Sequence, residues 1–229
     1  MDADDREFLL AMGGSPVASF GAQGLFDLKS YYEATEVFLA SSEMERRTRI
    51  QSARDQMDSE MRGYLLSSES SLLWEDYFPS ELRATVLVAI MSFFERYLNG
   101  VCAEVGMLVR TKISHKKLKG SALDRAKTFL LDLCALNGPR VELWDEMRQL
   151  QQLRNLLVHN GGVPDSEQEK KRAGALADAI AGVVATEFGL DLETQALRHA
   201  FERVEAFMGE LEAAASAMCE HVKRFENET

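Results

Sequence analysis

The stretch that decides the fold is residues 197–225, LRHAFERVEAFMGELEAAASAMCEHVKRF. Apolar residues recur in it at alternating steps of four and three, which places them on one stripe of an α-helix. The pattern predicts a straight helix of about 30 residues, about 45 Å long at 1.5 Å per residue. Packing along its whole length in a bundle accounts for this stripe better than a free coiled coil does. The stripe consists of Leu197, Phe201, Val204, Met208, Leu211, Ala215, Met218, Val222 and Phe225.

Helical spacing also dominates the chain before this stretch. Residues 28–67 read as one long helix, or as two helices joined near Ser42. Another helix starts at Pro79, with Ser80 as its expected N-cap. This helix is apolar nearly all round between Val86 and Phe94, so we expect it at the centre of the domain. By contrast, residues 1–27 hold several glycines and no period, which indicates an irregular arm with at most a short helix.

The second half of the chain continues the helical pattern up to residue 160. Residues 121–136 form a short helix in which Ser121 and Asp124 resemble a capping box. Residues 139–160 form the next helix, which Gly161 and Gly162 end. Residues 163–192 give weaker signals: a polar run over 165–172, an Ala-rich helix over 173–184 and an extended piece near 188–192. The sequence therefore predicts an all-α helical bundle, with an arm (1–27), an N-terminal helical extension (28–78) and the bundle itself (79–229).

Composition narrows the class of protein. The chain has 26 basic and 37 acidic residues, a net charge of −11, which counts against general affinity for nucleic acid. The longest nearly charge-free apolar stretch, residues 84–94, is shorter than the roughly 20 residues of a membrane span, so we expect no membrane segment. The acidic N-terminus does not resemble a secretory signal. The three cysteines are far apart without metal-type spacing, which predicts buried reduced thiols in a cytoplasmic protein with no metal or cofactor. They are Cys102, Cys134 and Cys219.

One segment departs from the acidic average. Residues 110–120, RTKISHKKLKG, contain five basic residues and no acidic one. A solvated loop and an electrostatic footprint for RNA explain this run equally well. The basic residues are Arg110, Lys112, Lys116, Lys117 and Lys119.

Four polar residues crowd the end of the helix over 139–160. Asn155 and His159 are four apart and share a face, whereas Arg154 lies about 140° from His159 around the axis. A second copy of this helix across a two-fold axis would place two arginines and two histidines in one cleft. The other three histidines, His115, His199 and His221, lie in charged contexts and are expected at the surface. Asn160 completes the polar set.

These residue types suit RNA cleavage without a metal. The ribose 2′-hydroxyl is a nucleophile beside the scissile phosphate, and histidine is the usual acid–base group near neutral pH. Arginine supplies bidentate donors for the charge that develops on the phosphorane. Asn155 can orient the imidazole or a phosphate oxygen.

The same residues resemble a known family. Arg154-Asn155-x-x-x-His159 at a helix end is similar to the signature of HEPN domains (higher eukaryotes and prokaryotes nucleotide-binding), and FFERYLN over residues 93–99 is similar to the family's earlier acidic helix. LRNLLVHNGG over residues 153–162 resembles prokaryotic members of toxin–antitoxin and phage-defence systems. The resemblance covers roughly residues 80–225.

The resemblance implies a homodimeric α-helical bundle and, for many members, a metal-independent endoribonuclease. Arg154 and His159 would then be catalytic, Asn155 would orient them, and Glu95 would hold Arg154 by an ion pair, with Asn160 in support. RNA would be the substrate, and an antitoxin or another defence protein a partner. A toxin subclass carries Tyr two residues after the histidine, where this chain has Gly161, which counts against that mode of control.

Two alternatives stay open at this stage. The polar set can be a helix cap that only binds water. The fold can also serve as a non-catalytic scaffold, a partner- or nucleotide-binding module, or an antitoxin-like subunit, which the acidic net charge fits.

Overall fold

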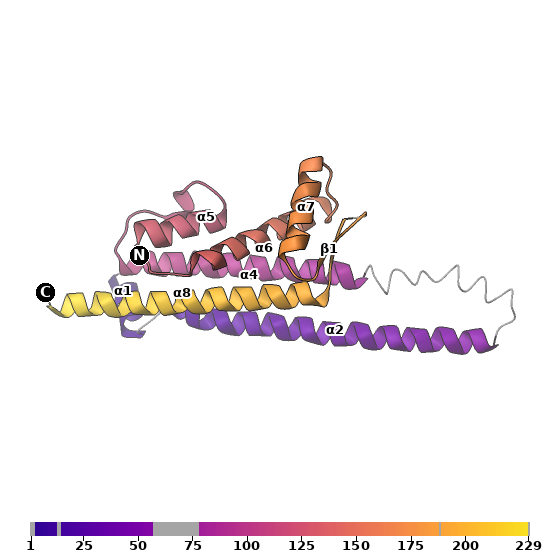
Figure 1. Ribbon diagram of the computed structural model, residues 1–229. Coiled ribbons are helices and arrows are strands. Elements are labelled where there is room, and N and C mark those ends of the chain that lie inside the picture. Colours follow the sequence, from indigo (N-terminus) through magenta and orange to yellow (C-terminus); the bar gives the residue numbers. More distant parts are fainter. Residues whose placement is uncertain (1–2, 13–14, 57–77, 188, 229) are drawn as a thin grey trace.

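A computed structural model describes residues 3–12, 15–56, 78–187 and 189–228 and shows an all-α bundle with one small hairpin (Figure 1). Within these residues the helices are α1 (Ala3–Met12), α2 (Pro16–Gln56), α4 (Phe78–Leu108), α5 (Ala122–Lys127), α6 (Val141–Asn160), α7 (Glu167–Ala179) and α8 (Thr194–Glu228). A 3₁₀ turn, η2 (His115–Lys117), and a π-helical turn, η3 (Thr128–Leu133), flank α5. Strands β1 (Val183–Thr186) and β2 (Gly189–Leu192) pair antiparallel, with Val183 opposite Leu192.

The helices are arranged in layers around α4 and α8, which run side by side (Figure 1). α5, α6 and α7 lie on one side of this pair, and α1 and α2 on the other. Aromatic rings fill the centre of the bundle. Phe207 of α8 packs edge-on against Phe94 of α4 and Trp144 of α6, with ring centroids 5.1 and 4.7 Å apart. The Trp144 indole N–H also donates to the Pro139 carbonyl at 3.1 Å, so the ring is buried without an unpaired donor.

The stripe of α8 is confirmed as the inner face of a bundle helix. Its first six residues, from Leu197 to Ala215, are all buried. The stripe then leaves the core, since Met218 and Val222 are half-buried and Phe225 is exposed at the end of the helix. A uniform sequence pattern therefore covers a helix whose burial decreases toward its C-terminal end, although Met218 still packs against the core.

α4 is the central helix that its composition predicts. Its buried residues include Ile90, Phe94 and Val101, each 1% exposed or less. By length and composition α4 is able to cross a membrane, and half of its most apolar stretch is buried inside the bundle. α2, α6 and α8 pack against α4 and cover the buried half. Ser80 is not the N-cap, because α4 begins at Phe78 and the Ser80 hydroxyl donates instead to Asp191 Oδ1 of β2 at 3.2 Å.

The irregular arm predicted for residues 1–27 is wrong for the described part of that range, which is helical. α2 is one continuous helix as far as Gln56, and residues 57–67 of the predicted helix lie outside the described residues. Two of the glycines that suggested a loop, Gly21 and Gly24, are contact points with α4, while Gly13 and Gly14 lie outside the described residues. A Cβ at Gly21 would lie 2.5 Å from the Tyr97 ring, and one at Gly24 would lie 2.7 Å from Phe93. Leu25 is buried in the main core, so this region is part of the bundle and not an appendage.

The region between α6 and α8 differs in its boundaries from the prediction. Ser166 caps α7 by accepting from the Glu169 N–H at 3.2 Å, so the polar run over 165–172 includes the exposed first turns of a helix. α7 ends at Ala179, and Val183 already belongs to β1. The extended piece is confirmed as β2 over residues 189–192, while Phe188 lies outside the described residues.

Candidate functional site

The end of α6 is fixed in place by its two glycines. Gly161 adopts the left-handed conformation, with φ 57°, and the Gly162 N–H donates back to the Leu156 carbonyl at 3.2 Å. This backbone pattern ends a helix and favours residues without a Cβ. The Gly162 carbonyl accepts from the Leu190 N–H at 3.0 Å, which ties the helix end to β2. The end of α6 is therefore attached to β2, and the predicted stop at Gly161 is confirmed.

Packing sets which side of α6 is presented to solvent. Leu153 and Leu156 are buried, whereas Asn155 and His159 are exposed one turn apart. Val158, 47% exposed, lies between Arg154 and His159 around the axis at 100° per residue. The outward strip thus carries polar groups on both sides of one aliphatic side chain. Asn160 is the last residue of α6, and its side chain lies outside the described part.

Arg154 and Asn155 contact one another directly. Arg154 Nη1 donates to Asn155 Oδ1 at 3.0 Å. The Nε of Arg154 is buried and has no hydrogen-bond partner in the described chain. A guanidinium that lacks a carboxylate partner keeps its full charge, and the remaining Nη2 donors can bind an anionic ligand.

Glu95 does not hold Arg154, and the expected ion pair is absent from the described residues. The carboxylate instead accepts from Gln151 Nε2 at 3.4 Å. Gln151 is one turn before Asn155 on α6. Glu95 therefore contacts α6 about one turn before Arg154, its predicted partner. Because Gln151 lies outside the Arg-Asn-x-x-x-His signature, the motif gave no sign of this contact.

One copy of the chain does not bring Arg154 and His159 together. Five residues separate them along α6, about 7.5 Å of axial rise, in addition to the angle of about 140°. In the described residues no hydrogen bond joins the two side chains. Within one copy, Arg154 therefore hydrogen-bonds to Asn155, and His159 makes no hydrogen bond to Arg154.

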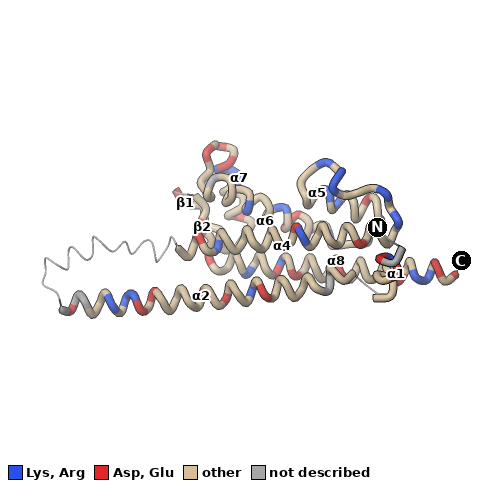
Figure 2. Tube along the Cα trace, turned by 180° about the vertical axis from the view of Figure 1, so that it is seen from behind, with Lys and Arg blue, Asp and Glu red and all other residues tan. Residues whose placement is uncertain are grey.

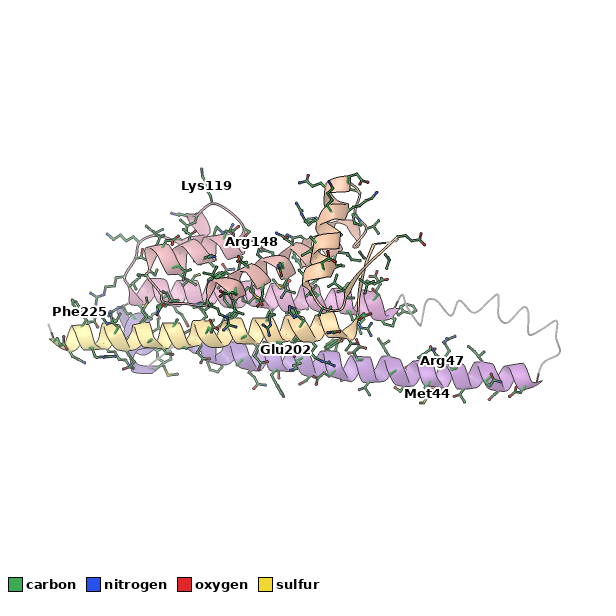
Figure 3. All side chains as sticks on the ribbon, viewed as in Figure 1. Met44, Arg47, Lys119, Arg148, Glu202 and Phe225 are labelled. Atoms are coloured by element: carbon green, nitrogen blue, oxygen red, sulfur yellow. The ribbon has the colours of Figure 1, made fainter. Side chains whose placement is uncertain are left out.

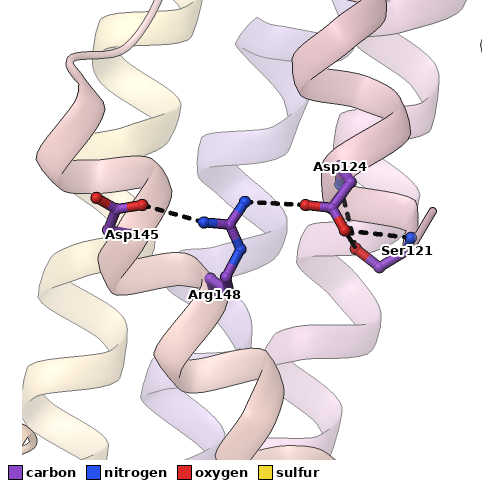
Figure 4. A network of polar contacts seen from close by, with 4 residues as sticks. All are labelled: Ser121, Asp124, Asp145 and Arg148. Carbon is purple, nitrogen blue, oxygen red and sulfur yellow. Dashed lines mark hydrogen bonds and ion pairs between the residues drawn. The ribbon is translucent and has the colours of Figure 1, made fainter.

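The basic segment lies at the other end of α6. Its four lysines are exposed, while Arg110 pairs with Glu226 of α8 at 3.2 Å. Seen from behind, Lys and Arg gather on the loop near α5, and Lys119 points outward from it (Figures 2 and 3). α5 is attached to α6 by Arg148, which donates to Asp124 at 2.9 Å and to Asp145 at 3.2 Å (Figure 4). From Arg148 to His159 is about 16 Å along the helix.

The capping box at the start of α5 is confirmed and belongs to the same network (Figure 4). The Asp124 N–H donates to Ser121 Oγ, and Asp124 Oδ2 accepts from the Ser121 N–H. Hydrogen bonds from Ser121, and then from Arg148, lower the pKa of Asp124. Arg148 is thereby neutralised by two carboxylates, unlike Arg154.

His115 anchors the basic segment, although its charged context predicts a surface residue. The ring is buried and packs edge-on against Phe129 at 5.7 Å. Its Nε2 lies 2.8 Å from Asn99 Oδ1, and Asn99 Nδ2 donates to the Glu95 carbonyl at 2.7 Å. Burial first, and then the nearby cations of Lys116 and Arg125, lower the pKa of His115. His199 is also not fully exposed, whereas His221 is.

The cysteines are confirmed as buried free thiols. Burial raises the pKa of Cys102 to about 12 and that of Cys134 to about 11. In the part of the chain that the structure describes, no group of three or more His, Cys, Asp or Glu side chains is arranged to hold a metal ion. Comparison with protein-family models, curated proteins and solved structures finds no match to this chain.

Proposed function

We propose that this protein is an endoribonuclease of HEPN type that cleaves RNA without a metal, at a site made by the α6 ends of two copies. The observation that carries this proposal is the outward strip of α6, on which Arg154, Asn155 and His159 are presented by a helix end attached to β2. The Arg154 guanidinium makes no ion pair within the described residues, and its Nε is buried without a hydrogen-bond partner. Function in a toxin or anti-phage defence system is what the sequence resemblance adds.

The chemistry assigns one role to each side chain. His159 of one copy accepts the proton of a ribose 2′-hydroxyl, whose oxygen attacks the adjacent phosphorus. Water gives a proton to the departing 5′-oxygen as the P–O5′ bond breaks, and the protonated His159 then releases its proton to solvent. Arg154 stabilises the negative charge on the phosphorane. The products are a 2′,3′-cyclic phosphate and a 5′-hydroxyl, and no proton or electron is left unassigned.

A second copy is needed because one α6 keeps Arg154 and His159 apart. Val158 lies between them and is half exposed, so it offers an apolar contact at the centre of a paired α6 surface. Across a two-fold axis Arg154 of one copy would approach His159 of the other. The exposed lysines of residues 112–119, on the loop near the other end of α6, would bind phosphates of an RNA long enough to extend from the cleft.

The test is cleavage of a mixed tRNA and mRNA pool in EDTA. His159→Ala and Arg154→Ala should each lower cleavage at least 100-fold, because each removes a transition-state interaction. His221→Ala and Arg198→Ala serve as matched controls, since both side chains are exposed on α8. They should leave the rate within twofold, and circular dichroism should show that all four variants are folded.

Mixing the two inactive variants tests whether the site is shared. A heterodimer of Arg154→Ala with His159→Ala holds one intact arginine and one intact histidine across the axis, so part of the cleavage should return. Val158→Asp should abolish cleavage by separating the two α6 ends while it leaves the reacting groups in place. Cleavage that needs Mg²⁺, or that survives His159→Ala, would contradict the mechanism.

A second candidate is a non-catalytic binding module built on the same fold. It is favoured by the bond between Arg154 and Asn155, which satisfies part of the guanidinium without any substrate. In that case the double variant Arg154→Ala/His159→Ala would keep the full biological effect of the protein, and pull-downs would identify its partner.

A further inference from the structure

The second half of α2 extends beyond the helices against which the first half packs. α2 and α4 run antiparallel, with Val17 beside Gly100, Gly21 beside Tyr97 and Gly24 beside Phe93. Farther along, Arg83 of α4 binds Glu36 of α2 at 2.7 Å. The same register puts the first residue of α4 beside about residue 40 of α2. Residues 41–56 therefore extend about 24 Å past the start of α4, as Figure 1 shows.

One flank of α2 carries three exposed aromatic side chains. Phe20, Tyr31 and Phe38 are 76%, 64% and 64% exposed. Their spacings of 11 and 7 residues return to the same side of a helix. Phe20 also lines a shallow groove between α2 and α4, together with Phe93 and Arg96. The aromatic stripe thus begins at the groove and continues onto the extended half of the helix.

The stripe is complementary to itself in an antiparallel arrangement. With a two-fold axis between Ala34 and Thr35, Tyr31 of one copy lies opposite Phe38 of the other. The same register puts Phe20 opposite Arg49, and aromatic–aromatic and cation–π contacts are both favourable. Ala34 at the axis lets the helices approach closely. We propose that two copies of this chain associate antiparallel through the aromatic stripe of α2, so that the extended half of each α2 lies in the α2–α4 groove of the other.

Charge supports this occupant over an unrelated helix. In this register Glu45 of the second copy lies level with Gly24, beside Arg96 of the first copy. Glu45 and Arg96 are both exposed, and neither makes an ion pair within the described residues. A two-fold axis forms this pair twice, once on each side. The groove therefore offers a cation where the second copy carries a carboxylate.

The available area is sufficient for a specific contact. Six aromatic side chains of about 150–250 Å² each, roughly two thirds exposed, supply about 800 Å² before their neighbours are counted. The helices would overlap over nearly the full length of α2, so the neighbours add to this. A specific interface needs about 1,000 Å² or more. Because α2 and α6 lie on opposite sides of the bundle, this contact is independent of the proposed nuclease cleft (Figure 1).

Light scattering across a concentration series tests the contact with the full chain. Phe38→Glu should lower the mass of the assembly to that of the dimer that the proposed α6 contact alone would hold, because it buries an unpaired charge at the aromatic cluster. Met44→Glu is the matched control, since Met44 is equally exposed and lies about 120° from Phe38 around the axis of α2. It should leave the mass unchanged. Phe38→Glu with unchanged mass, or a wild type without association, would overturn the proposal.

Charge exchange and cross-linking test the register. Glu45→Arg and Arg96→Glu should each weaken association at least fivefold, and the double variant should restore it. Ala34→Cys should form a disulfide-linked dimer on mild oxidation, because the axis passes beside it and the native thiols are buried. Ser41→Cys should not, since an antiparallel pair places it far from its own copy. Equal cross-linking at both positions would indicate a parallel pair and contradict the proposal.

Discussion

α2 and α4 are both long helices, yet they differ in how much of their apolar surface is covered. α4 is buried on most sides because α2, α6 and α8 pack around it. α2 lies at the edge of the bundle, where Leu25 and Tyr32 are buried and large side chains such as Phe26 and Phe38 are exposed. Similar residue types therefore stabilise the fold in one helix and remain available for a partner in the other. The sequence of α4 is the more apolar of the two, but which apolar side chains of α2 are covered is set by the neighbours of that helix.

The largest expected loss of stability comes from truncating a buried side chain of α4. Phe94→Ala in α4 should lower the free energy of unfolding by about 3–5 kcal/mol, because it leaves a cavity beside Phe207 in the core. Phe26→Ala in α2, where the ring is 63% exposed, should cost less than about 1 kcal/mol. Urea denaturation of both variants measures the contrast. Equal costs would mean that the flank of α2 is packed in solution.

Removing the ion pair between α4 and α2 should lower the free energy of unfolding by an intermediate amount. Arg83 holds Glu36 through two hydrogen bonds of 2.7 and 3.0 Å and also donates to the Leu192 carbonyl at 3.2 Å. Arg83→Ala should cost about 1–3 kcal/mol, because it leaves a half-buried carboxylate without its cation. Arg47→Ala, which removes an exposed pair within α2, should cost only about 0.3–0.5 kcal/mol.

The same pair predicts a pH dependence. Burial raises the pKa of Glu36, but hydrogen bonds from Arg83 and Tyr32 outweigh it and hold the pKa below the ordinary 4.5. The folded state then binds fewer protons than the unfolded state, so this stabilisation is complete above pH 4.5 and is lost as the pH falls through the lowered pKa. The acid-induced loss should be smaller in Arg83→Ala. An unchanged acid profile in that variant would show that the pair carries no stability.

The smallest expected effect concerns the start of α2. Glu104 of α4 is buried and accepts from the Ser15 hydroxyl and from the Val17 N–H at 3.2 Å. Burial raises its pKa above 4.5, although these two hydrogen bonds oppose the shift. The folded state binds more protons here, so stability should fall as the pH rises from 4.5 through the raised pKa.

Glu104→Gln isolates this contribution. It should remove the slope at a cost below about 1 kcal/mol, because the amide still accepts from Val17 and can donate to Ser15. Glu81→Gln, exposed in the first turn of α4, is the control and should keep the slope. Thermal denaturation between pH 4.5 and pH 8 measures both variants. A slope retained in Glu104→Gln would contradict the assignment.

Much of the fold was predictable because the apolar residues of each helix recur with the helical period in the sequence. The stripe of α8, the apolar α4 and the stop at Gly161 each depend on residues within a few turns of each other. The glycines of α2 led to a wrong prediction because their role depends on residues that are distant in sequence. Gly21 and Gly24 leave room for the rings of Tyr97 and Phe93 on α4. His115 misled likewise, because its partner Asn99 is on another helix.

The candidate site shows the same division. The order of Arg154, Asn155 and His159 on α6 followed from helical geometry, and their outward side follows from the burial of Leu153 and Leu156. The ion pair of Glu95 with Arg154 was wrong, because the crossing of α4 and α6 places Gln151 and not Arg154 next to that carboxylate.

The sequence by itself determined that this chain is helical, where most helices start and stop, and which polar groups gather at the end of α6. Those properties depend on backbone hydrogen bonds and side-chain spacings within one helix. Only the tertiary structure decided which apolar stripe is covered, which arginine is neutralised and which histidine is buried. Those properties depend on contacts between helices, and neither the period of a helix nor its composition specifies its neighbours.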